Sequence, residues 1–87
     1  MRYLLSKRFE EDFAKLPKKT KVKAVEVLSL FTQDPTDPTL RIHPLKGKWV
    51  GHYSINITGD TRAIYYIITP DNLVHFIAIG SHSQLYG

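Results

Sequence analysis

Four side chains spread along the chain point most directly to chemistry, namely His43, Arg62, His82 and Tyr86. An imidazole titrates near neutral pH, so it can give or take a proton in the cell. A guanidinium presents a planar fork that matches phosphate oxygens, and a tyrosine ring near a chain end can stack on a nucleobase. Cleavage of RNA by its own 2′-hydroxyl needs one proton removed, one supplied, and the charge on the phosphorane neutralised. These residue types therefore suit metal-independent RNA cleavage.

Each of these residues also has a structural interpretation. His43 precedes Pro44 and can be a loop residue, Arg62 can be a surface residue of a strand, and His75 lies inside an apolar run, where it is packed or capping. The sequence leaves the role of His52 open. No His-x-His or His-x3-His spacing occurs and cysteine is absent, so we predict neither a metal site nor another cofactor.

Length and composition predict a single domain over residues 1–87. A hydrophobic fraction of 43% supports one modest core, and the lack of cysteine excludes disulfides and thiolate nucleophiles. The opening apolar run, Tyr3 to Leu5, is too short for a secretory signal or a membrane span. We therefore expect a cytoplasmic protein without a membrane partner.

The charge balance favours a polyanionic partner such as nucleic acid. Twelve Lys and Arg against eight Asp and Glu give a net charge of +4. The basic residues form two clusters. The first lies at the junction of two expected helices and comprises Lys15, Lys18, Lys19, Lys21 and Lys23. The second flanks a loop rich in Pro and Gly and comprises Arg41, Lys46 and Lys48.

The first half of the chain predicts a short strand at 3–5 and a helical hairpin. Ser6 is a good N-cap for a first helix that Pro17 ends. A second helix carries an apolar stripe that we assign to the core, made of Val22, Val25, Leu28 and Phe31 and widened by Ala24, Val27 and Leu30.

The second half predicts three consecutive antiparallel strands. Residues 53–57 alternate apolar and polar, 62–68 are apolar on both faces, and 73–79 follow a turn at 70–72. The order β-α-α-β-β-β gives an α+β fold with the helical hairpin on one face of a mainly antiparallel four-stranded sheet. The N-terminal strand lies at an edge or between others.

Strand alternation places polar side chains on the face away from the helices. His52, Ser54 and Asn56 share that face, and Arg62 can point to the same side. His43 precedes these strands and His82 follows them, so we expect both imidazoles and the guanidinium to converge on one rim.

Three segments together resemble toxins of the RelE/ParE superfamily, most closely the YafQ type. They run from His43 to Tyr53, from Asp60 to Tyr66 and from Gly80 to Tyr86. In the YafQ type a histidine precedes Pro-Leu-x-Gly, a Trp-x-Gly-Tyr-like strand follows, and the chain ends in Gly-Thr-His-x-x-Leu-Phe. The order of segments agrees, and the similarity covers the whole chain.

The resemblance implies a RelE-like toxin of a type II toxin-antitoxin system. Such a toxin is an mRNA endoribonuclease that acts in the ribosomal A site and inhibits translation, so ribosome and mRNA are expected partners. It also implies a cognate antitoxin that wraps the toxin. The positive charge suggests that the antitoxin segment is acidic and partly disordered. A heterotetramer with an antitoxin dimer is one expected assembly.

Roles follow from matching positions. His43 matches a proposed general base, which is glutamate in the YoeB type, and His82 matches the general acid, although the two roles are exchangeable. Arg62 matches the phosphate-stabilising arginine of the RelE and YoeB types, where the YafQ type is aliphatic. Tyr86 matches the terminal aromatic. The expected RNA-binding residues are Arg41, Lys46, Lys48 and Asp60, the last on an acidic position of the YafQ site.

The chain also departs from the YafQ pattern. Ser54 and Asn56 stand where that type has an Asp and a His, and neither can do acid–base work at neutral pH. Two other functions stay open: a ParE-like inhibitor that binds DNA gyrase and cuts nothing, and a basic domain that binds RNA without cleavage. The set of histidines, arginine and tyrosine favours the nuclease, because a binding toxin has no chemical need for it.

Overall fold

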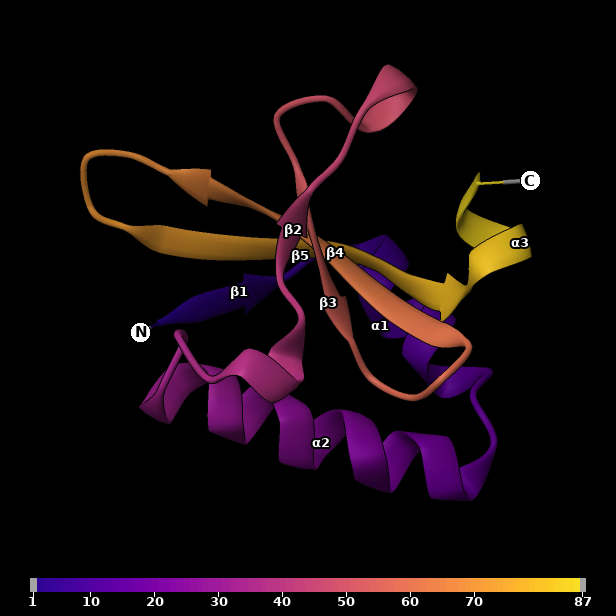
Figure 1. Ribbon diagram of the computed structural model, residues 1–87. Helices are drawn as coiled ribbons and strands as arrows, with labels where there is room; N and C mark the ends of the chain where they lie inside the picture. Colours follow the sequence, from indigo (N-terminus) through magenta and orange to yellow (C-terminus); the bar gives the residue numbers. More distant parts are fainter. Residues whose placement is uncertain (1, 87) are drawn as a thin grey trace.

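A five-stranded sheet with two helices against one face forms the protein in the computed structural model, which describes residues 2–86 (Figure 1). The elements are β1 (Tyr3–Leu5), α1 (Lys7–Ala14), α2 (Lys18–Gln33), η1 (Pro38–Leu40), β2 (His43–Pro44), η2 (Gly47–Trp49), β3 (Tyr53–Asn56), β4 (Thr61–Ile68), β5 (Leu73–Ser81) and α3 (His82–Tyr86), where η marks a 3-10 helix. The strand order is β1-β5-β4-β3-β2.

The predicted α+β class and the order of the main elements are confirmed, but the strand count is five, not four. The pairs among β2, β3, β4 and β5 are antiparallel, and β1 lies at an edge, parallel to β5. The extra strand is β2, where His43 pairs with Ser54. Pro44 lacks an N–H, so this segment can pair only at an edge of the sheet.

The helical hairpin begins at the predicted cap. Ser6 Oγ accepts a hydrogen bond from the Phe9 N–H at 3.0 Å and donates to the carbonyl of Ile77 at 3.1 Å, which fixes α1 on β5. The prediction that Pro17 ends the first helix is wrong, because α1 already stops at Ala14. Pro17 instead precedes α2 as its N-cap, a place where its fixed φ of −58° is tolerated.

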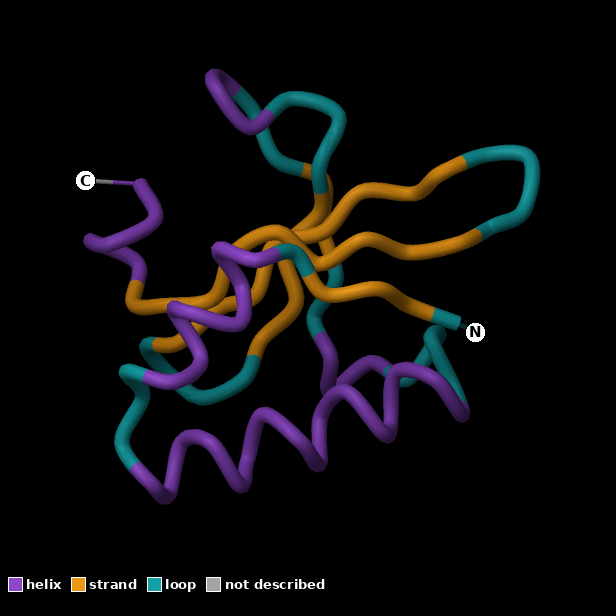
Figure 2. The backbone as a smooth tube through the Cα atoms, turned by 180° about the vertical axis from the view of Figure 1, so that it is seen from behind, coloured by secondary structure: helices purple, strands orange, loops and turns teal. Residues whose placement is uncertain are grey.

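The main core lies between the hairpin and the sheet. Phe9 and Phe31 from the helices meet Phe76 of β5 at ring-centroid distances of 5.8 and 5.6 Å. Figure 2, from behind, shows α1 lying across the strands and α2 below them. The predicted α2 stripe was partly wrong, since Val22 and Val25 are 56% and 59% exposed. The buried residues of α2 are Ala24, Val27, Leu28 and Phe31.

The C-terminal segment forms the short helix α3. Ser81 and Gln84 form a reciprocal capping box: Ser81 N–H donates to Gln84 Oε1 at 2.8 Å, and Gln84 N–H donates to Ser81 Oγ at 3.2 Å. The Ser-x-x-Gln spacing was the sequence signal that could have predicted this helix. Within residues 2–86, no helix has the length and apolarity needed to cross a membrane.

Candidate active site

The structure gathers the four chemistry-bearing residues around one hollow of about 360 Å³ on the sheet face away from α1 and α2. His43 comes from β2, Arg62 from β4, and His82 and Tyr86 from α3. Their separation in sequence is bridged by the sheet register, which pairs β2 with β3, β3 with β4, and β4 with β5. The rest of the lining is Leu45, Lys46 and Ser54.

The geometry of His43 fixes its tautomer. Its Nδ1 lies 3.1 Å from the carbonyl oxygen of Arg41. A carbonyl oxygen only accepts, so this hydrogen bond requires the proton on Nδ1 and leaves Nε2 of the neutral ring as an acceptor. Arg41 has a left-handed backbone with φ of 49°, which forms the turn before His43. The arrangement suits a base that takes a proton at Nε2.

His82 and Tyr86 are presented together by one turn of α3. Their ring centroids are 4.7 Å apart. The backbone N–H of His82 donates to the carbonyl of Asp60 at 3.2 Å, so the start of α3 is tied to the turn between β3 and β4. The histidine is exposed and the tyrosine half-buried, which leaves both rings open to the pocket.

Arg62 is anchored by backbone carbonyls and not by a carboxylate. Its Nη1 donates to the carbonyls of Thr58, Gly59 and Thr61 at 2.8, 3.2 and 3.2 Å. Among residues 2–86, Arg62 Nε and Nη2 donate no hydrogen bond. Within the described chain the guanidinium pairs with no carboxylate and has donors left for a phosphate.

Ser54 lies under the pocket and Asn56 does not. Ser54 is fully buried, and its Oγ has no hydrogen-bond partner within the described chain. A buried hydroxyl without a hydrogen-bond partner is rare in native proteins, so its presence here needs a physical explanation. Asn56 instead lines a hollow beside α2 and η1. Only one of the two residues that depart from the YafQ pattern therefore lines the pocket.

The expected RNA-binding residues are divided by the fold. Lys46 lines the pocket, whereas Arg41 and Lys48 are exposed outside it. Lys48 Nζ lies 5.8 Å from the centroid of the Trp49 ring, over its face. Arg41 and Lys48 lie within two residues of the lining residues His43 and Lys46, so they add positive charge around the pocket and not in its lining.

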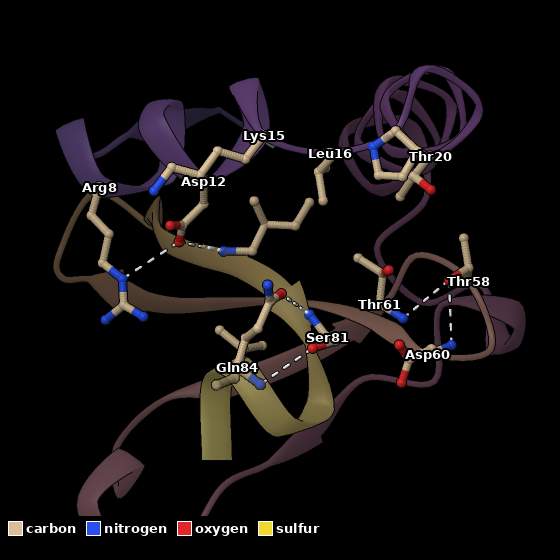
Figure 3. A pocket seen from close by; sticks show the side chains of 13 residues that line it. Arg8, Asp12, Lys15, Leu16, Thr20, Thr58, Asp60, Thr61, Ser81 and Gln84 are labelled. Atoms are coloured by element: carbon tan, nitrogen blue, oxygen red, sulfur yellow. Dashed lines mark hydrogen bonds and ion pairs between the residues drawn. The ribbon is translucent and has the colours of Figure 1, made fainter. Parts of the chain in front are cut away.

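Asp60 lines a second, larger hollow of about 510 Å³ between α1, β5, α3 and the turn between β3 and β4 (Figure 3). There Arg8 Nε lies 3.4 Å from Asp12 Oδ2, which also accepts from the Ile79 N–H at 3.3 Å. The Asp12 carboxylate therefore joins α1 to the backbone of β5 within this hollow. Asp60 does not line the pocket that holds the two histidines.

A second small core holds α3 in place, and sequence analysis missed it. Leu85 packs with Ile64 and Ala78, all buried, against Leu45, Trp49, Ile77 and Tyr86. The indole Nε1–H of Trp49 donates to the carbonyl of Leu85 at 3.1 Å. A five-residue helix is unstable alone, so these contacts position His82 and Tyr86.

The remaining histidines lie apart from the pocket lining. His52 Nδ1 lies 3.2 Å from the carbonyl of Val50, and His75 Nδ1 lies 3.0 Å from the Tyr66 hydroxyl. His75 is half-buried and packed against Tyr66, in line with its structural interpretation. Among residues 2–86, no group of three His, Cys, Asp or Glu side chains is arranged to hold a metal ion.

Comparison with known proteins identifies a family of toxins. The family model described as the bacterial toxin of type II toxin-antitoxin systems, YafQ, matches residues 1–87. The crystal structure of YafQ from E. coli strain BL21(DE3) is 25% identical, covers both chains fully and superposes with a TM-score of 0.81. No curated protein sequence is similar enough to count as a match.

Two further solved structures are similar over nearly the whole chain. The E. coli DinJ-YafQ toxin-antitoxin complex contains a chain that is 26% identical, with 98% of this chain and 96% of that one covered and a TM-score of 0.78. The Helicobacter pylori protein HP0894 is 31% identical, with 99% of each chain covered and a TM-score of 0.71.

Proposed function

The chain belongs to the YafQ family of bacterial type II toxins, and we propose that it inhibits translation as a ribosome-dependent mRNA endoribonuclease. The observation that carries this proposal is the convergence of two imidazoles and a guanidinium on one pocket lined also by an aromatic ring. These are the groups that acid–base cleavage of RNA needs, and neither imidazole belongs to a hydrophobic core.

In this proposal His43 removes the proton from the 2′-hydroxyl through Nε2, because Nδ1 is committed to the carbonyl of Arg41. The hydroxyl oxygen attacks the adjacent phosphorus, and His82 protonates the 5′-oxygen that leaves. Arg62 donates to the phosphorane oxygens, whose charge grows in the transition state. Tyr86, beside His82, stacks on a base next to the scissile bond.

The hydroxyl of Ser54 replaces a carboxylate in this scheme. It cannot serve as a base at neutral pH, so the acid–base work falls to the two histidines alone. Arg62 then supplies the charge stabilisation. This site is a hybrid of the YafQ and YoeB patterns.

We further propose that a cognate antitoxin holds this toxin inactive, because the related YafQ chain forms a toxin-antitoxin complex with DinJ. The net charge of +4 favours an acidic segment that folds on binding. Such a segment would neutralise the pocket rim and cover α3.

The test is to add purified protein to translating ribosomes and to map the 5′ ends of the mRNA, beside a DNA gyrase supercoiling assay. We expect new ends within codons in the A site, formed without divalent metal beyond what the ribosome needs, and unchanged supercoiling. Loss of supercoiling without new mRNA ends would instead establish a gyrase inhibitor. RNA binding with neither effect would leave a module that does not cleave.

A further inference from the structure

Four rings form a continuous row on the sheet face that carries the pocket. Trp49 and His52 have centroids 5.5 Å apart, His52 and Tyr66 also 5.5 Å, and Tyr66 and His75 5.3 Å. Each ring packs edge to face against the next, with interplanar angles of 79°, 68° and 63°. We call these four residues the ring row.

The ring row follows from the register of the sheet. Tyr53 pairs with Tyr65, so the preceding His52 lies beside Tyr66, and Tyr66 pairs directly with His75. On β1, Leu4 continues the row beside His75 and is 50% exposed. All four rings are only half-buried, unlike the phenylalanines of the main core. The row is therefore a surface feature that runs from η2 and the turn before β3 across β4 to β5.

The electrostatics of this face suit a polyanion. None of the eight acidic residues lies in a strand, whereas Arg62, His43 and His75 do. Two cations lie over the Trp49 ring: Lys48 Nζ at 5.8 Å and Arg8 Cζ at 5.9 Å from the centroid, with Arg8 also paired to Asp12. Partly exposed rings on β4, on β5 and in the segment before β3, with no acidic residue in these strands, form the kind of platform on which sheets stack two or three bases of single-stranded RNA.

The row begins at the wall of the pocket. Trp49 packs in the same small core as Leu45 and Tyr86, both of which line the pocket. The N–H of Leu45 donates to the carbonyl of His52 at 2.9 Å. An RNA strand that leaves the pocket past Tyr86 would therefore meet the ring row next.

We propose that the ring row is a binding surface for single-stranded RNA, on which nucleotides outside the cleaved step stack. This inference rests on the proposed function for the direction of the strand, but the stacking itself does not require cleavage. Its ligand is recognised by the faces of its bases and by its phosphates, so it carries little sequence preference.

Fluorescence anisotropy of the full chain with labelled 2′-O-methyl RNA tests the proposal, because this RNA cannot be cut. The probes are a trimer, a nonamer of mixed sequence and the same nonamer paired in a duplex. We expect the single-stranded nonamer to bind at least about tenfold more tightly than the trimer. Tyr66→Ala and His75→Ala should each weaken nonamer binding by about fivefold to tenfold and leave trimer binding unchanged.

Matched variants separate stacking from folding. Ile67→Ala changes the next residue of β4, which points to the opposite face and is 37% exposed, and it should bind as the wild type does. Tyr66→Phe keeps the ring and removes only the hydroxyl beside His75, so it should retain most nonamer affinity. Circular dichroism confirms that each variant is folded.

The inference is overturned if folded Tyr66→Ala and His75→Ala bind the nonamer within twofold of the wild type. It is also overturned if the duplex binds as tightly as the single strand, or if these changes weaken only the binding of an acidic peptide, which would make the row a protein-binding surface. Ribosomal cleavage separates the two proposals. If RNA binding depends on the ring row but no cleavage occurs, only the proposed nuclease activity is wrong. If cleavage occurs but RNA binding does not depend on the ring row, only this inference is wrong.

Discussion

Trp49 and Leu85 are joined by a hydrogen bond of 3.1 Å from the indole N–H to the main-chain carbonyl, across 36 positions of sequence. The last carbonyls of a helix lack partners within the helix, and here a side chain from the loop before β3 supplies one. Because α3 is a single short turn that bears His82 and Tyr86, this bond connects the packing of the loop to the geometry of the pocket.

Trp49→Phe keeps an aromatic ring in the small core but removes the donor. We expect kcat for mRNA cleavage to fall by about tenfold or more with little change in KM, because a small displacement of α3 misplaces His82. Steady-state kinetics on ribosomes measure this. Val50→Ala, at the next and 72% exposed position, is the matched control. Wild-type kcat in Trp49→Phe would show that the bond does not position the site.

His82→Ala and Arg62→Ala remove the proposed proton donor and the proposed charge-stabilising donor. Both side chains are on the pocket rim and outside the main core, so both variants should fold normally. Cleavage should fall by roughly 10²-fold to 10⁴-fold for the histidine and by roughly 10²-fold to 10³-fold for the arginine. Single-turnover assays with saturating ribosomes measure the loss. Full activity in both variants would exclude this pocket as the nuclease site.

Ser54→Ala deletes a buried hydroxyl that has no partner within residues 2–86. We expect the free energy of unfolding to rise by about 1 kcal/mol, because the penalty of the unsatisfied group is removed. Cleavage should decrease, since the hydroxyl faces the pocket and substrate can satisfy it. Urea denaturation and the ribosome assay measure the two effects. Ser29→Ala on the exposed side of α2 controls for the substitution itself, and a destabilised Ser54→Ala would contradict the argument.

Lys46→Glu and Lys48→Glu test whether the basic rim holds RNA phosphates. Each should weaken ribosome binding at physiological salt and lower the dependence of log affinity on log salt by about one. Lys7→Glu makes the same change in net charge at the start of α1, away from the pocket. Equal losses in all three variants would mean that overall charge, and no local contact, governs binding.

The raised pKa of Tyr65 predicts that the protein loses stability in alkaline solution. Burial, and next the neighbouring Tyr53 hydroxyl, raise the pKa of Tyr65 from 10.0 to about 12. The folded state therefore holds this proton where the unfolded chain loses it. Its contribution is complete below pH 10 and decreases by up to about 1.4 kcal/mol per pH unit as the pH rises to 12. Chemical denaturation of wild type and Tyr65→Phe across this range should show a shallower decline in the variant.

The sequence alone determined the features that depend on short-range geometry. Ser6 caps α1 because its side chain reaches an N–H three residues on, and the run of β4, apolar on both faces, indicated a central strand. The motif residues His43, Arg62, His82 and Tyr86 also stood out by type. Even α3 has a local signal in the sequence, because Ser81 and Gln84 have the spacing of a capping box.

Only the tertiary structure decided which of these residues share a pocket. The register of the sheet brings His43 over Ser54 and sets Arg62 beside the start of α3, whereas Asp60 and Asn56 line other hollows. Periodicity fixes the face of a strand but not its neighbours, because pairing between distant segments is set by the packing of the whole core. For the same reason the ring row and the bond from Trp49 to Leu85 could not be predicted from spacing.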